Sequence, residues 1–247
     1  MRSWTRVCGP RSGNRTPGRD RELLERGAAD AVLRSDTVTA AAKGRTVVNL
    51  SADTPDRARS TARWAAAHGV RYLGGAIMTP TTTIGTPAAV FLHSGPAELY
   101  REHRPVLEAL GGTHTHLNEE IGRAAAYDVA LLDIFWTAMT GFAHALAVAR
   151  AEGITARELA PFAKGIGAIL PPLFEQYAGA LDDGDFSGND NPLTSAASSM
   201  AHIAHTSEAH GIDAGVMRAA GDLARRAIAE GHGADGFVRI AELLGRA

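Results

Sequence analysis

One long helical stretch, residues 118–152, constrains the fold of this chain more than any other feature. It contains no proline, its glycines stand only at 122 and 141, and it is apolar on nearly every side from residue 121 to residue 148. At about 1.5 Å per residue it is roughly 50 Å long, which exceeds the core of one small domain. A helix that is apolar all round must be buried, so we expect it to pack against a second domain or a partner chain.

Two aspartates interrupt this apolar stretch, Asp128 and Asp133. Every position one helical turn from Asp128 is apolar, and Phe135 lies two turns on, almost in line with it. A carboxyl group in such surroundings loses solvation, which raises its pKa and lets it hold and give a proton. The alternative is a core aspartate that is satisfied by hydrogen bonds. Asp133 has no aromatic residue in line and is not a candidate. The apolar neighbours of Asp128 are Ala124, Ala125, Leu131 and Leu132.

The composition argues against several classes of protein. The formal net charge is −2 at pH 7, whereas a nucleic-acid-binding protein carries a basic surplus. Cys8 is the only cysteine, which excludes an internal disulfide and a cysteine-built zinc site. Outside the long helix no run of about 18 residues is apolar and free of charge, and the helix itself carries two aspartates, so no membrane span is expected. Residues 1–13 lack the apolar segment of a secretory signal, and we expect a soluble, cytoplasmic protein.

The first half of the chain alternates predicted strands with predicted helices. Thr54 followed by Pro55 predicts a helix start, and Gly69 predicts the end of that helix after residue 68. Such alternation predicts βαβ units and a parallel sheet. Between Gly27 and Thr46 there is room for one short helix and no apolar strand. The predicted strands are residues 46–50, 71–78, 88–93 and 113–117, and a second helix is predicted over 96–110.

After the long helix the pattern contains no strand. Thr155 and Glu158 have the spacing of a capping box, and residues 191–210, 214–230 and 234–244 are predicted to be helices. The segment 184–192 is dense in turn-forming residues and is interpreted as a connection. The fold class expected is therefore α/β to about residue 117 and all-α afterwards.

Two groups of histidines are candidates for metal sites. His114 and His116 alternate along a predicted strand, but no carboxylate or cysteine stands at ligand spacing, so surface histidines are expected. His202, His205 and His210 share one helix, and a solvated or interface face is favoured over a metal. No metal site is predicted.

Three segments stand out: VVNLSADTP (47–55), GGAIMTPTTTIGTPAAVFLHSG (74–95) and GRAAAYDVALLDIFW (122–136). Together they resemble a known family, the NADPH-dependent imine reductases and reductive aminases of the β-hydroxyacid dehydrogenase superfamily. The resemblance covers roughly residues 14–26 and 32–247. It implies an incomplete Rossmann-like NADP-binding domain at 1–117, an interdomain helix at 118–152 and a helical C-terminal dimerisation domain at 153–247. It also implies a homodimer that exchanges these domains.

The resemblance also implies roles for individual residues. Asp128 matches the carboxylate that the family places near the imine as proton donor or charge partner, and Trp136 matches an aromatic position of the substrate pocket. β-Hydroxyacid dehydrogenases carry a lysine at the position of Asp128, which argues against a hydroxyacid substrate. Ala52 stands where reductive aminases have asparagine. Asn14, Arg15, Thr16 and Arg19 match the element that holds the 2′-phosphate of NADPH, Asn49 and Ser51 the loop beside the nicotinamide, and Ile77, Met78 and Ile84 the apolar pocket wall.

The implied activity is hydride transfer from NADPH to the C=N bond of a cyclic imine. The start of the chain departs from the family pattern, because a strand and a G-x-G-x-x-G turn belong about 20 residues before Asn14 and residues 1–13 contain neither. We therefore expect a truncated Rossmann-like domain. Two alternatives follow: a fragment that lacks cofactor binding and acts only as a helical dimerisation scaffold, and, more distantly, a β-hydroxyacid dehydrogenase-like NADP oxidoreductase.

Overall fold

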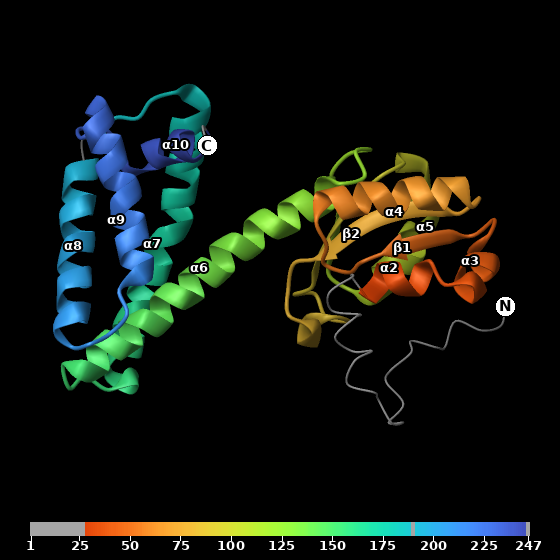
Figure 1. Ribbon diagram of the computed structural model, residues 1–247. Helices are drawn as coiled ribbons and strands as arrows, with labels where there is room; N and C mark the ends of the chain where they lie inside the picture. Colours follow the sequence, from red (N-terminus) through yellow and green to blue (C-terminus); the bar gives the residue numbers. More distant parts are fainter. Residues whose placement is uncertain (1–27, 189–190, 246–247) are drawn as a thin grey trace. The chain divides into compact units, whose positions relative to one another are not determined.

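The computed structural model describes residues 28–188 and 191–245. The chain divides into two compact units, Met1–Phe135 and Trp136–Ala247. The first contains a sheet with helices and the second is helical, which confirms the predicted order of α/β followed by all-α structure (Figure 1). The proposed domain limits at 117 and 152 stay predictions.

The sheet of the first unit has four strands in the order β1-β2-β3-β4. β1 pairs with β2 and β3 with β4 in parallel, but β2 and β3 are antiparallel. The prediction of a parallel sheet is therefore wrong at the centre. Residues 78–89 connect β2 to β3 through one 3₁₀ turn, η1 (Thr81–Thr83), and contain no α-helix, whereas a parallel crossover usually contains one. The strands are β1 (Thr46–Asn49), β2 (Arg71–Ile77), β3 (Val90–Ser94) and β4 (Thr113–His116).

Helices cover the two faces of this sheet. α4 (Pro55–Ala67) packs over Tyr72, and α5 (Ala97–Leu107), which continues into η2 (Glu108–Leu110), packs over Leu73. Tyr72 and Leu73 are consecutive in β2, so their side chains point to opposite faces. Two short helices, α2 (Ala28–Leu33) and α3 (Asp36–Ala42), stand before β1, where only one was expected. Leu33 and Ala42 join the core under α4.

The ends of α4 follow from its sequence. The Thr54 hydroxyl accepts a hydrogen bond from the backbone N–H of Arg57 at 3.4 Å, and Pro55 occupies the first turn. The helix closes at His68, and Gly69 follows with φ of 67°. Glycine adopts this left-handed conformation without the steric cost that other residues meet. The predicted start and stop of this helix are confirmed.

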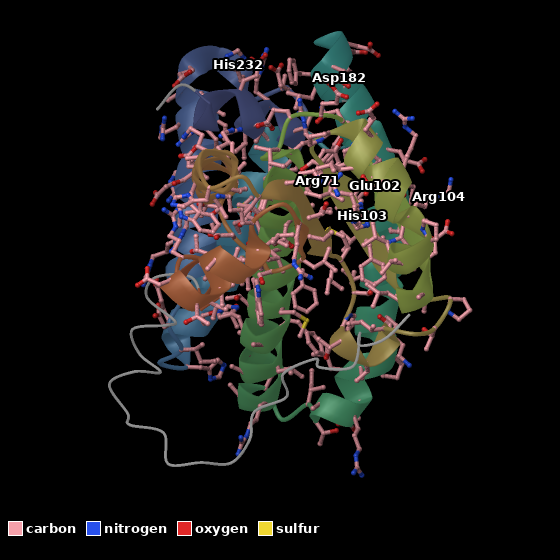
Figure 2. All side chains as sticks on the ribbon, turned by 90° about the vertical axis from the view of Figure 1, so that its right-hand side faces the viewer. Arg71, Glu102, His103, Arg104, Asp182 and His232 are labelled. Carbon is pink, nitrogen blue, oxygen red and sulfur yellow. The ribbon has the colours of Figure 1, made fainter. Side chains whose placement is uncertain are left out.

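A two-pronged ion pair ties the start of β2 to α5. Arg71 Nη1 lies 2.7 Å from Glu102 Oε2, and Arg71 Nη2 donates to Glu102 Oε1 at 3.1 Å. Figure 2 shows the two side chains next to each other. The hydrogen bond from Arg71 holds the pKa of the Glu102 carboxyl below its ordinary value. Both groups are exposed, so the pair fixes geometry more than it stabilises the fold.

The prediction that the histidines of β4 are surface residues is wrong. His114 and His116 are half-buried and lie on the sheet face that α5 covers. His114 stacks on Phe91 with ring centroids 4.4 Å apart, and His116 stacks on Tyr100 at 5.0 Å. His116 Nε2 lies 2.8 Å from the carbonyl oxygen of Gly95. Both imidazole rings are thus packed against aromatic rings of neighbouring elements. Alternation along one strand does not predict such contacts.

The long helix, α6, runs from Arg123 to Ala151 and is shorter at its start than predicted. The preceding residues are held to β3 instead: the Ser94 hydroxyl donates to the Ile121 carbonyl at 2.9 Å and accepts from the Ala124 N–H at 3.1 Å. By length and composition alone α6 could cross a membrane, with a window of mean hydropathy 1.4. One such helix is weak evidence, since a core helix of a soluble protein passes the same test.

The second unit is built from helices. Thr155 and Glu158 form the predicted capping box at the start of α7, with the Thr155 N–H donating to Glu158 Oε2 at 2.8 Å. His202, His205 and His210 are exposed on α8, as expected, and His210 lies 2.7 Å from Glu152. The helices are α7 (Ala156–Asp183), α8 (Leu193–Ala209), α9 (Gly215–Ala227) with the π turn Ile228–His232, and α10 (Ile240–Leu244) after the 3₁₀ turn Phe237–Arg239.

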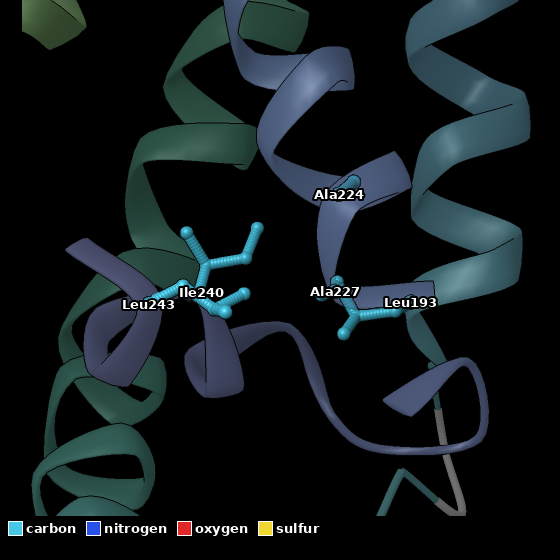
Figure 3. Close-up of a cluster of buried hydrophobic side chains, with 5 residues drawn as sticks. All are labelled: Leu193, Ala224, Ala227, Ile240 and Leu243. Carbon is cyan, nitrogen blue, oxygen red and sulfur yellow. The ribbon is translucent and has the colours of Figure 1, made fainter. Parts of the chain in front are cut away.

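The core of this unit lies between α8, α9 and α10. Its fully enclosed side chains come from the first turn of α8, the last turn of α9 and α10 (Figure 3). The described residues of the segment 184–192 form a connection, as predicted, with bridges from Ser187 to Asp235 and from Pro192 to Gly236. The core side chains are Leu193, Ala224, Ala227, Ile240 and Leu243.

Candidate active site

Asp128 is a buried carboxyl group on α6, with 3% of the residue exposed. Ala124 and Ala125, one turn before it, are buried as well. Within residues 28–188 and 191–245 the structure gives its carboxyl group no hydrogen-bond or ion-pair partner. Burial raises the pKa of Asp128 above its ordinary value. A carboxyl group in this state can hold a proton at a pH where an exposed aspartate has lost it.

Asp133 provides the contrast on the same helix. It lies five residues further along α6 and is exposed. The two aspartates therefore differ in solvation although both stand in one apolar stretch. The catalytic role of Asp128 stays a prediction, and the described part of the chain supplies no hydrogen-bond partner for a core aspartate at this position.

An apolar cavity of about 300 Å³ lies beside the carboxyl end of β2. One wall is the segment that follows this strand, which includes Ile77 and Met78, and the other is α6 just beyond Asp128. Leu131 and Leu132 lie one helical turn after Asp128, which is itself not one of the lining residues. The residues that line it are Ile77, Met78, Thr79, Pro80, Leu131, Leu132 and Phe135.

Two of the four predicted pocket residues do not line this cavity. Ile84 closes η1 and is 37% exposed, and Trp136 on α6 is 63% exposed. Ile77 and Met78 do line it. The roles of all four in substrate binding stay predictions.

Asn49 shapes the turn at the carboxyl end of β1. Its Nδ2 donates to the Tyr72 hydroxyl at 3.0 Å, and its Oδ1 accepts from the Ser51 N–H at 3.0 Å. Both ends of the amide are therefore used within the protein, and Ser51 is left exposed on the outer side of the turn. In sheets with parallel strands, ligands bind outside the carboxyl ends of the strands, and this turn stands at such an end. Asn49 therefore holds the turn, and the cofactor-binding roles of Asn49 and Ser51 stay predictions.

The other predicted cofactor residues, Asn14, Arg15, Thr16 and Arg19, lie outside the described residues. The described part can therefore be tested only for the nicotinamide end of a cofactor. It fits there, because the exposed Ser51 and the apolar cavity lie at the carboxyl ends of the parallel strands β1 and β2. Among residues 28–188 and 191–245 no group of three or more His, Cys, Asp or Glu side chains could hold a metal.

Sequence reasoning missed two residues that the geometry brings forward. Tyr72 is buried and bonds Asn49 from the neighbouring strand, and Thr79 lines the cavity within the IMTP segment. The signal that could have found Thr79 is its place within the segment 74–95, next to Ile77 and Met78. Tyr72 carried no signal, because its contact with Asn49 depends on the register of β1 and β2.

The comparisons with known proteins agree with this geometry. Residues 120–246 match the family described as NADPH-dependent reductive aminase-like, C-terminal domain. An NADPH-dependent reductive aminase of Aspergillus oryzae is 30% identical over 228 residues, which are 89% of this chain and 75% of that protein.

Solved structures give the same result. The imine reductase from Myxococcus stipitatus in complex with NADP⁺ superposes with a TM-score of 0.84 at 32% identity, over 90% of this chain and 78% of that one. A reductive aminase from Aspergillus terreus, in complex with NADPH4, cyclohexanone and allyl amine, gives a TM-score of 0.78 at 31% identity, over 87% and 76%. The chain belongs to the family of NADPH-dependent imine reductases and reductive aminases.

Proposed function

We propose that this chain uses NADPH to reduce the C=N bond of cyclic imines, with Asp128 as the proton donor or charge partner of the imine nitrogen. The observation that supports this most directly is the buried carboxyl group of Asp128, which has no hydrogen-bond partner in the described part of the chain and lies one helical turn before residues that line an apolar cavity. A general acid works best when its pKa lies near the working pH, and burial shifts the pKa of Asp128 in that direction. A hydroxyacid substrate would not suit a cavity whose side walls are aliphatic and aromatic.

The cavity supports a substrate with a hydrocarbon body. Its lining is apolar except for Thr79, and small-molecule sites of this kind orient a ligand with few polar groups. Asp128 lies one turn before Leu131, so a ring held against Leu131 and Phe135 can present its nitrogen toward the carboxyl group. Cyclic imines combine such a body with one basic nitrogen.

The cofactor supplies the hydride when it is bound. In this proposal Ser51 meets its nicotinamide end and Asn49 keeps the β1 turn in shape. Arg15 and Arg19, with Asn14 and Thr16, hold the 2′-phosphate, since an arginine can form two charge-assisted hydrogen bonds to a phosphate. A soluble, cytoplasmic protein stays part of the prediction.

The deciding experiment measures NADPH binding to the purified chain through the fluorescence of the reduced nicotinamide. We expect micromolar binding with NADPH and weaker binding with NADH, and turnover of a simple cyclic imine. Absence of binding up to millimolar NADPH would favour the alternative, a helical dimerisation scaffold without cofactor function.

We also infer that the chain forms a domain-exchanged homodimer. α6 and α7 leave large apolar side chains exposed, and a partner chain would remove them from water. The most exposed are Phe162, at 77%, and Trp136 and Ile166, both at 63%, and others on these helices are Ile134, Phe135, Met139 and Ile169.

The dimer can be tested with one charge on α7. Phe162→Asp is expected to raise the dissociation constant of the dimer by at least tenfold, because a carboxylate would be buried in an apolar interface. Sedimentation velocity across a concentration series measures this shift. Val106→Asp is the matched control, since Val106 is 60% exposed on α5 and outside this surface. A parent chain that stays monomeric at micromolar concentration contradicts the inference.

A further inference from the structure

The connection between β2 and β3, residues 78–89, forms one wall of the apolar cavity. Met78, Thr79 and Pro80 are its contribution, and they face the α6 side chains across about 300 Å³ of space. The width of the cavity therefore depends on how firmly this segment is held. Apart from η1, this segment is not part of a strand or helix, so its hydrogen bonds to neighbouring residues hold it in position.

Thr79 joins the two ends of this connection through its side chain, beside a backbone bond from the Met78 N–H to the Val90 carbonyl at 2.9 Å. Its hydroxyl oxygen accepts a hydrogen bond from the Val90 N–H at 3.2 Å, and it lies 2.8 Å from the Thr83 hydroxyl. The Thr83 hydroxyl is also 2.7 Å from the Pro80 carbonyl oxygen. A hydroxyl has one hydrogen, so if Thr83 donates to Pro80, Thr79 donates to Thr83. The Thr79 hydroxyl is then both donor and acceptor, and its single hydrogen is not available to a ligand.

The far end of the connection is fixed separately. The Gly85 N–H donates to the Leu110 carbonyl at 2.7 Å. Gly111 packs so closely that a Cβ at its position would stand 2.9 Å from the Gly85 carbonyl carbon. The tip is therefore anchored to the η2–β4 turn, and Thr79 anchors the end that borders the cavity.

We propose that Thr79 is a positioning residue that sets the width of the substrate cavity, by locking Met78 and Pro80 in place through Val90 and Thr83. The inference rests on the proposed function, since it takes the cavity to be the imine site. Thr79 does not touch the reacting atoms. It acts through the wall that it holds.

The test replaces the hydroxyl without changing the shape of the side chain. Thr79→Val removes both hydrogen bonds and keeps the volume, and Thr79→Ser keeps the hydroxyl. With a cyclic imine that carries a phenyl group, we expect Thr79→Val to raise KM about tenfold with kcat within about twofold of the parent, because substrate placement weakens and the chemical groups stay. Thr79→Ser is expected to restore the parent KM. Thr82→Val, an exposed threonine three residues on, is the matched control and leaves KM unchanged.

A second readout separates this inference from the proposed function. Hydrogen exchange of the Val90 amide reports the bond to Thr79 directly, and imine affinity is measured by calorimetry in parallel. The parent chain could bind the imine and not turn it over. In that case, faster Val90 exchange and weaker imine binding in Thr79→Val would support the positioning role of Thr79 and reject the proposed reductase activity. Faster Val90 exchange with unchanged KM and unchanged imine affinity would overturn the positioning role of Thr79. Unchanged Val90 exchange would overturn it as well. A parent chain that does not bind the imine overturns both.

Discussion

Replacement of Asp128 by asparagine is expected to lower kcat for a cyclic imine by about 10²–10⁴-fold, the range that one positioned general acid contributes. Asparagine has nearly the same shape and cannot deliver a proton to the imine nitrogen. NADPH binding should change little, because the variant leaves the β1 turn with Asn49 and Ser51 intact. Stopped-flow measurement of NADPH oxidation under single-turnover conditions isolates the chemical step.

The control for this variant lies on the same helix. Asp133→Asn makes the same chemical change at an exposed site outside the lining of the cavity. We expect its rate to stay within about twofold of the parent, since exposed substitutions away from a site have small effects. A rate for Asp128→Asn equal to that of Asp133→Asn would remove Asp128 from the reaction.

The pH profile separates the two roles that Asp128 can have. Burial raises the pKa of Asp128, so a proton donor loses activity as the pH rises through this raised value. A charge partner acts as the carboxylate and loses activity as the pH falls through the same value. The folded state holds the proton more tightly than the unfolded state, so burial of Asp128 costs stability as the pH rises. Asp128→Leu should therefore be more stable than the parent above neutral pH, although it is inactive.

Local signals in the sequence predicted the parts of the fold that depend on neighbouring residues. The cap at Thr54, the capping box at Thr155 and the turn at Gly69 each need only a few adjacent residues, and all three are present. The long helix was predicted for the same reason. Its start was placed too early, because the Ser94 hydroxyl from β3 holds the Ile121 carbonyl and the Ala124 N–H.

Contacts between strands could not be predicted in this way. The bond between Asn49 and Tyr72 joins residues 23 positions apart, and it exists only because β1 and β2 pair in a particular register. The direction of β3 was predicted wrongly for a similar reason. A general alternation of strands and helices predicts parallel strands, but the segment after β2 contains no crossover helix. The buried His93 went unnoticed, because nothing local marks it as different from His114 and His116.

His93 is completely buried on β3 and lies within a chain of hydrogen bonds. Its Nε2 is 3.0 Å from His114 Nδ1, and His114 Nε2 is 3.1 Å from the Gly111 carbonyl oxygen. The carbonyl can only accept, so His114 carries its proton on Nε2 and accepts at Nδ1 from His93 Nε2–H. His93 Nδ1 is then unprotonated, and it has no hydrogen-bond partner among the described residues. The neutral form of this pair is the one that the fold accommodates.

Acid is therefore expected to destabilise the sheet. Burial, with the neighbouring His114 and His116, lowers the pKa of His93 to about 4. Tyr100 from α5 packs on the same ring and offers no charge at acidic pH. In the unfolded state His93 takes up a proton near its ordinary pKa, whereas in the folded state it does so only near pH 4. The contribution of His93 to the free energy of unfolding is therefore fully present above about pH 6.5 and declines as the pH falls toward 4. The full loss is roughly 3 kcal/mol, at about 1.4 kcal/mol for each unit of pKa difference.

His93→Gln tests this with the hydrogen bond retained. The glutamine Nε2 can replace the imidazole Nε2 as donor to His114 Nδ1, and it does not titrate. Hydrogen exchange of the β3 and β4 amides in urea, corrected for the intrinsic pH dependence of exchange, measures the stability of this unit alone. The parent should lose most of the roughly 3 kcal/mol between pH 7 and pH 4, and the variant only a small part of it. His205→Gln, at an exposed histidine of α8, should behave as the parent. An equal decline in parent and His93→Gln would mean that other groups cause the acid sensitivity, and His93 would then have no special part in it.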